Sequence, residues 1–105
     1  MQLDTKNSII SEIISLRRLI NDGKFEECHG RVDADLEIND SVPDLWYVKS
    51  MVEMTNSNIH NYCILKARSL RKEGYDLVVF TDKELSDSVF KVNGMEIFNP
   101  DKKSS

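Results

Sequence analysis

Two amphipathic runs separated by little more than Gly23 set the strongest constraint on how this chain can fold. In residues 8–22, apolar side chains recur at every third or fourth position, which is the period of an α-helix with one buried face. Residues 24–38 repeat the pattern more sparsely, from Phe25 to Leu36. Because so short a connection brings two helices side by side and antiparallel, we expect a helical hairpin.

A second hairpin is predicted to follow Ser41. The tetrapeptide Ser-Val-Pro-Asp at 41–44 is a helix start signal: a serine that can cap, a proline in the first turn and a carboxylate that closes a capping box. We expect helices over residues 42–55 and 59–73. The second of these ends at Gly74, with basic residues near its negative end.

Beyond Gly74 the pattern changes from helix to strand. Residues 75–80, Tyr-Asp-Leu-Val-Val-Phe, form a short β-branched and aromatic run that predicts a strand. Asn93-Gly94 separates two further runs, at 89–92 and 95–98, and this dipeptide between such runs is typical of a tight β-hairpin.

The length of 105 residues suits one compact domain and is too short for two. We therefore predict a single domain over residues 1–105 with an α+β fold. Two antiparallel helical hairpins, four helices in all over 8–73, precede a small antiparallel sheet over 75–98 that ends in a C-terminal β-hairpin. Residues 99–105 are expected to be a flexible tail. Exposed strand edges favour self-association, so the sequence is also compatible with a homodimer.

The charge balance argues against a polyanionic partner. The chain has 14 Lys and Arg against 18 Asp and Glu, a formal charge of −4, so no global basic field attracts nucleic acid or an anionic membrane. The N-terminus lacks a basic region followed by an apolar run, and no stretch reaches the roughly 18 apolar residues of a membrane span, which predicts a cytoplasmic protein. In that compartment, Cys28 and Cys63 are expected to be buried free thiols rather than a disulfide.

The first hairpin also carries a motif. A glycine ends its first helix, Phe25 follows two residues later, then come Glu26-Glu27, and a Leu-Glu-Ile-Asn run at 36–39 ends its second helix. About 34 residues on, Trp46 falls in phase at the start of the next unit. On these residues the segment 8–73 resembles the tetratricopeptide repeat. The alternative left open is a generic four-helix arrangement in which the same residues are core.

The resemblance implies a protein-binding groove lined by the first helix of each hairpin. The residues at matching positions of this sequence that we assign to partner binding are Arg17, Asp44, Tyr47, Met51 and Met54. Arg, Tyr and Met are common interface residues, and Met adapts its shape to more than one partner. The alternative for Met51 and Met54 is that their side chains belong to the hydrophobic core and contact no partner.

No catalytic or cofactor signature is present in the sequence. The glycines are isolated, so no phosphate-binding loop forms. Cys28-His29 and His60 with Cys63 nominally supply four zinc ligands, but adjacent residues on a helix point about 100° apart and do not reach one ion. We therefore expect no enzyme activity, no metal and no cofactor.

We expect a non-catalytic protein-binding module that acts as an adaptor or as a small acidic inhibitor of the immunity type. An acidic face offers a second surface for the partner, although a solvated helix face explains it equally well; its residues are Glu26, Glu27, Asp33 and Glu37. The alternative function is a dimeric nucleic-acid-binding protein that uses the basic face of the fourth helix, at Lys66, Arg68, Arg71 and Lys72.

Overall fold

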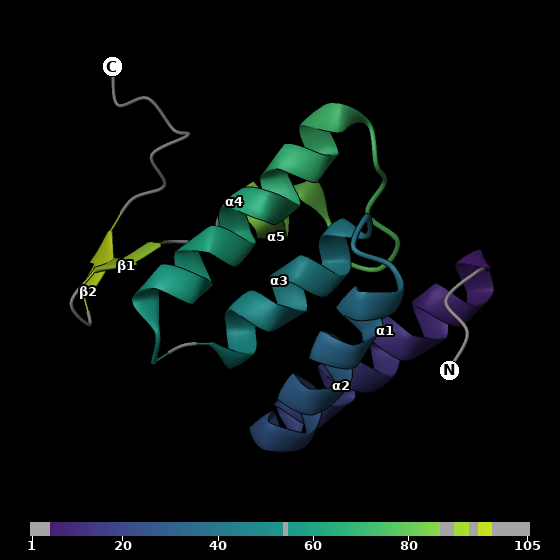
Figure 1. The fold of residues 1–105 in the computed structure, drawn as a ribbon, viewed down its shortest axis with the longest axis horizontal. Coiled ribbons are helices and arrows are strands. Elements are labelled where there is room, and N and C mark those ends of the chain that lie inside the picture. The colour runs from purple at the N-terminus through teal and green to yellow at the C-terminus, as the bar shows by residue number, and fades with distance from the viewer. Residues whose placement is uncertain (1–4, 54, 87–89, 93–94, 98–105) are drawn as a thin grey trace.

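The computed structural model describes residues 5–53, 55–86, 90–92 and 95–97, and helices dominate this part of the chain. Figure 1 shows α3 lying between the α1 and α2 pair on one side and α4 on the other. The elements in chain order are α1 (Lys6–Asn21), α2 (Phe25–Ile38), α3 (Pro43–Val52), α4 (Ser57–Glu73), α5 (Asp82–Ser86), β1 (Phe90–Val92) and β2 (Met95–Ile97).

Local sequence signals account for the ends of α1. The Thr5 side chain caps the N-terminus, because its hydroxyl oxygen accepts the Ser8 backbone N–H at 3.1 Å. At the other end Gly23 takes a φ of 76°, and the backbone N–H groups of Gly23 and Lys24 donate to Ile20 and Leu19 at 3.0 and 2.9 Å. This is a Schellman ending, and it turns the chain directly into α2.

The start of α3 differs from the expected capping box. Pro43 occupies the first turn as predicted, but Val42 is the cap residue and no side chain caps this end. The backbone N–H of Ser41 instead donates to the Asn39 side-chain oxygen at 3.1 Å. The Asp44 carboxylate is therefore left for other partners, described below.

The main core packs α1, α2 and α3 together with one residue from beyond α4. Phe80 is that residue, and it is 7% exposed. The other members are Ile13, Leu16, Leu19, Cys28, Val32, Val42, Leu45 and Val48. Cys28 and Cys63 are both free and buried, which confirms the expected state of the thiols.

The predicted α+β fold class is wrong. Residues 75–80 form no strand but an irregular segment between α4 and α5, because the backbone N–H groups of its last three residues bond to a side chain of α3 instead of a neighbouring strand. Within the described residues the only β-structure is the pair β1 and β2, three residues each, with Phe90 opposite Ile97 in antiparallel register. Two such short strands form no sheet layer, so the protein is a helical one.

Part of that prediction falls on residues whose structure is not described. The Asn93-Gly94 turn and the tail at 99–105 lie outside the described residues, and so does Met54.

Candidate functional site

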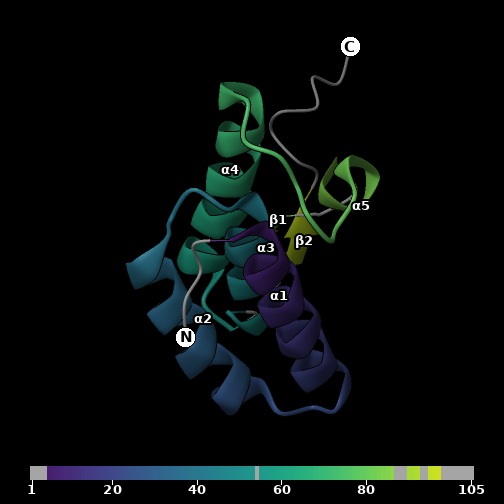
Figure 2. The ribbon, with the colours of Figure 1, turned by 90° about the vertical axis from the view of Figure 1, so that its right-hand side faces the viewer.

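The groove predicted between α1 and α3 is filled by the protein's own chain. The Phe80 ring meets the Tyr47 ring edge to face, with centroids 4.8 Å apart, and the Arg17 guanidinium lies 5.4 Å from the Phe80 centroid. Figure 2 shows the green segment from α4 to α5 passing beside α3 and α1. Arg17 and Tyr47 thus contact this segment instead of forming the walls of an open groove.

Asp44 holds the same segment by its backbone. One carboxylate oxygen accepts the N–H of Val78 and the other accepts those of Val79 and Phe80, each at 2.9 Å. The Asp44 side chain is fully buried at 0% exposure. The carboxylate is therefore inaccessible to a partner and is engaged within the chain, so the structure gives no support to the predicted partner-binding role of Asp44. Met51 is half-buried and packs against the core.

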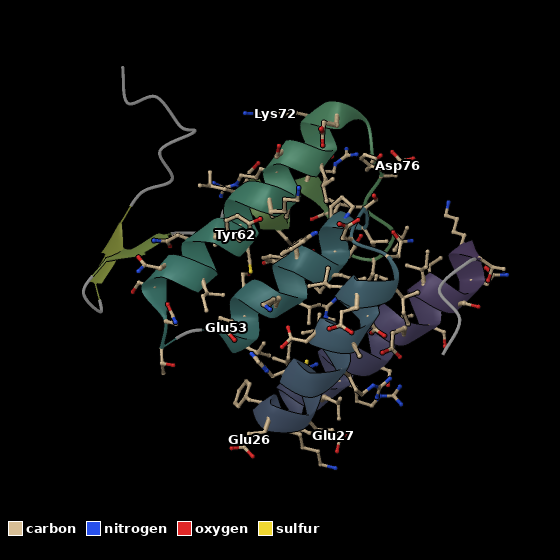
Figure 3. The ribbon with its side chains drawn as sticks, in the orientation of Figure 1. Glu26, Glu27, Glu53, Tyr62, Lys72 and Asp76 are labelled. Atoms are coloured by element: carbon tan, nitrogen blue, oxygen red, sulfur yellow. The ribbon has the colours of Figure 1, made fainter. Side chains whose placement is uncertain are left out.

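The predicted acidic face of α2 is divided into two parts. Glu26 and Glu27 are exposed in the first turn, and Figure 3 places both at one end of the helix. Asp33 and Glu37 lie further along, and at about 1.5 Å of rise per residue Glu37 is roughly 16 Å from Glu26. A single side chain of a partner can therefore contact only one of these two parts.

Asp33 and Glu37 line a shallow open groove of about 370 Å³ between α2 and α3. We call it the α2–α3 groove, and its lining residues are Asp33, Leu36, Glu37, Asp40, Trp46 and Lys49. Lys49 donates to Asp33 at 2.5 Å, so these two charges cancel. Within the described part of the chain no ion pair engages Glu37 or Asp40, which leaves the groove with two excess negative charges.

Trp46 forms the aromatic wall of this groove. Its indole N–H donates to the Asp40 backbone carbonyl at 2.8 Å, which satisfies the one polar group of the side chain and orients the ring. The Tyr62 ring of α4 packs against it edge to face at 5.8 Å between centroids, and Tyr62 itself is 57% exposed. The exposed Tyr62 ring, which Figure 3 places on α4, therefore adjoins the Trp46 wall of the groove.

A polar network beside the groove ties α2 to α3, and sequence reasoning missed it. The His29 ring contacts the Glu53 carboxylate and lies 3.4 Å from the Asp33 carboxylate. Asp33 also accepts from Lys49. The four-residue spacings 29 to 33 and 49 to 53 were a visible signal, but which helix pairs with which depends on the tertiary packing.

Two of the four predicted nucleic-acid contacts are used within the chain. Arg68 is 7% exposed and donates to the Leu85 backbone carbonyl at 2.9 Å, so the structure gives no support to its predicted role at an open basic face. Arg71 forms a two-pronged pair with Asp82 at 2.7 and 2.8 Å, which raises the pKa of Arg71 and lowers that of Asp82. Lys66 is half-buried and Lys72 is exposed.

A second polar cluster is buried between α1 and α2. Arg31 donates to both carboxylate oxygens of Glu12 and to the Ser15 hydroxyl, the latter at 3.1 Å. Glu12 and Asp35 are 2% and 4% exposed, and within the described residues Asp35 Oδ2 has no hydrogen-bond partner. Burial and the neighbouring Glu12 carboxyl raise the pKa of Asp35 to about 7.

The cysteine and histidine side chains do not form a nucleophilic or metal-binding arrangement among the described residues. Burial raises the pKa of both Cys28 and Cys63 to about 11, so neither is a thiolate nucleophile at neutral pH. His60 Nδ1 pairs with the Ser50 carbonyl at 2.6 Å. In the described part of the chain, no group of three or more His, Cys, Asp or Glu side chains is placed to hold a metal ion.

No protein-family model, curated protein or solved structure matches this chain. The helical structure itself gives no positive support to a tetratricopeptide repeat. Among the described residues, no helix has the length and apolar character needed to cross a bilayer. The fold and the site together define a class of protein, namely a small helical protein with an acidic groove, walled by an aromatic ring, between its second and third helices.

Proposed function

We propose that this chain is a non-catalytic protein-binding module, an adaptor or a small acidic inhibitor, that engages another protein through the α2–α3 groove. The observation that carries the proposal is the contrast between two surfaces. The groove expected between α1 and α3 is occupied by Phe80, whereas the α2–α3 groove presents an aromatic wall and carboxylates to solvent.

The side chains around the groove support this proposal. Trp and Tyr are enriched in protein interfaces because they supply much contact area at low conformational cost, and Trp46 and Tyr62 stand together here. Glu37 and Asp40 add negative charge at the rim, which favours a basic partner and speeds its encounter.

Nothing in the described part of the chain favours the nucleic-acid alternative, since Arg68 and Arg71 are bonded within the chain and the sequence carries a formal net charge of −4. The proposed compartment is the cytoplasm, and two free buried thiols support a reducing environment. Self-association stays a prediction.

Affinity capture from the native host tests the proposal. We expect a stoichiometric protein, identified by mass spectrometry, that survives nuclease treatment and is lost with the double variant Glu37→Lys, Asp40→Lys. The matched control is Glu26→Lys, Glu27→Lys, which reverses two charges in the first turn of α2, outside the groove, and should retain the partner. Material that disappears with nuclease, or that both variants retain equally, contradicts the proposal.

A further inference from the structure

We propose that the α2–α3 groove is a recognition site for an arginine side chain carried on an exposed segment of the partner protein. The inference rests on the proposed function and names the chemistry of the contact. Its three supports are the unpaired carboxylates, the oriented indole ring and the open shape of the groove.

The carboxylates supply acceptors for a cation. Glu37 and Asp40 are exposed at the rim, and in the described residues neither takes part in an ion pair. Asp33 is engaged with Lys49, so the groove's own ammonium does not neutralise the other two. A guanidinium carries five donors in a planar fork and can bond to two acceptors at once, whereas an ammonium acts as a point charge.

The indole ring supplies the second half of the contact. Trp is the aromatic ring that attracts cations most strongly, at up to about 6 Å from the ring centroid. The orientation of the Trp46 ring is fixed by its hydrogen bond to the Asp40 carbonyl and by its contact with the Tyr62 ring. The chain makes the same kind of contact internally, where the Arg17 guanidinium lies 5.4 Å from the Phe80 centroid.

The shape of the groove selects the source of the arginine. A free amino acid needs a pocket that buries most of its surface, and this groove is shallow and open. A side chain presented by a protein is positioned by contacts elsewhere in the interface, such as those available at the exposed Tyr62. Nucleic acid is disfavoured because the two excess charges of the groove repel phosphate.

Trp46 allows a direct test because it is the only tryptophan in the chain. The intact protein is titrated with a blocked tetra-arginine peptide, and Trp46 emission is followed at low and high salt. We expect a saturable change that weakens with salt. A tetra-lysine peptide should bind about fivefold more weakly, and a tetra-citrulline peptide, which keeps the shape without the charge, should cause no change.

Matched variants locate the site. Glu37→Gln with Asp40→Asn removes the two rim charges with little change in shape, and we expect the arginine peptide to bind about tenfold more weakly. Glu26→Gln with Glu27→Gln removes two charges from the far end of α2 and should change binding by less than about twofold. Circular dichroism verifies that both variants remain helical.

Three results overturn the inference: no saturable response to tetra-arginine, an equal response to tetra-citrulline, or an equal loss in both double variants, which would mean diffuse attraction to an acidic protein. The proposed function fails separately. A partner captured through the groove without a response to tetra-arginine overturns the inference alone. A normal peptide response without any captured protein overturns the proposed function and, with it, the protein source of the arginine, whereas the affinity of the groove for a guanidinium stands.

Discussion

At the scale of single residues, one carboxylate decides the course of the chain after α4. Asp44 is fully buried and accepts three consecutive backbone N–H groups, from Val78 to Phe80. Without this carboxylate the three N–H groups would lose their acceptor, and a buried unpaired donor costs about 1–3 kcal/mol.

Asp44→Asn should therefore lower the free energy of unfolding by on the order of 3 kcal/mol, because an amide carries no charge and has one acceptor oxygen instead of two. Urea denaturation of both proteins measures the difference. Asp76→Asn is the control, since Asp76 lies on the same segment with its side chain 88% exposed and should change stability little. Equal stability of Asp44→Asn and the natural protein would refute the proposed role.

Asp35 should make stability depend on pH. Its pKa is raised from 3.8 to about 7 in the folded protein, so between these values the folded state binds more protons than the unfolded state. The contribution of Asp35 to the free energy of unfolding is therefore full below about pH 4 and is lost as the pH rises through about 7. Asp35→Asn should remove that loss and be more stable relative to the natural protein at pH 8 than at pH 5. Urea denaturation across this range checks it; parallel stability profiles would contradict it.

At the scale of elements, the helices follow local rules closely. The apolar period predicts α1 and α2, and the turn between them needs only the positive φ of Gly23. Residues 75–80 show where local rules stop, because β-branched composition indicates extended backbone but cannot say whether a strand or a carboxylate will receive its N–H groups. Asp44 receives them here, so no strand forms.

Gly30 and Gly74 should respond to alanine with opposite signs. Gly30 lies inside α2 with nothing within 4 Å of an added Cβ, so Gly30→Ala should stabilise the protein by about 0.5–1 kcal/mol. Gly74 has a φ of 104°, where a side chain is strained, so Gly74→Ala should destabilise it by about 1 kcal/mol. Thermal denaturation of the two variants measures both effects. A shift of the same sign in both would show that backbone conformation does not control these sites.

At the scale of the whole molecule, the residues after α4 complete the core. Phe80 packs against residues of α1 and α3, and Arg68 and Arg71 of α4 bond to Leu85 and Asp82 in α5. Phe80 thereby covers the surface between α1 and α3 that was expected to form a groove, and the arginine contacts join α5 to α4.

Phe80→Ala should accordingly destabilise the protein by on the order of 3 kcal/mol, because it leaves a cavity beside Tyr47 and removes the Arg17 contact. Denaturant unfolding measures the loss. Tyr75→Ala is the control, since that side chain is 46% exposed. If the two variants lose stability equally, Phe80 is not the residue that joins this segment to the core.

The candidate site was only partly within reach of sequence reasoning. Asp33 and Glu37 were predicted as binding residues and do line the α2–α3 groove, but Trp46 was noted only as a repeat position. Asp35 lies between Asp33 and Glu37 in the sequence, yet it is buried beside Glu12 of α1. Charge and amphipathicity indicate that a residue is on a polar face, whereas the neighbours that bury it come from other helices.

The sequence by itself determined the helices α1 to α4, the glycine endings of α1 and α4 and the acidic character of α2, because these depend on side chains within a few positions of one another. Only the tertiary structure decided which groove stays open. That outcome depends on contacts between residues more than thirty positions apart, such as Asp44 with the N–H of Val78, whose formation depends on how whole helices pack.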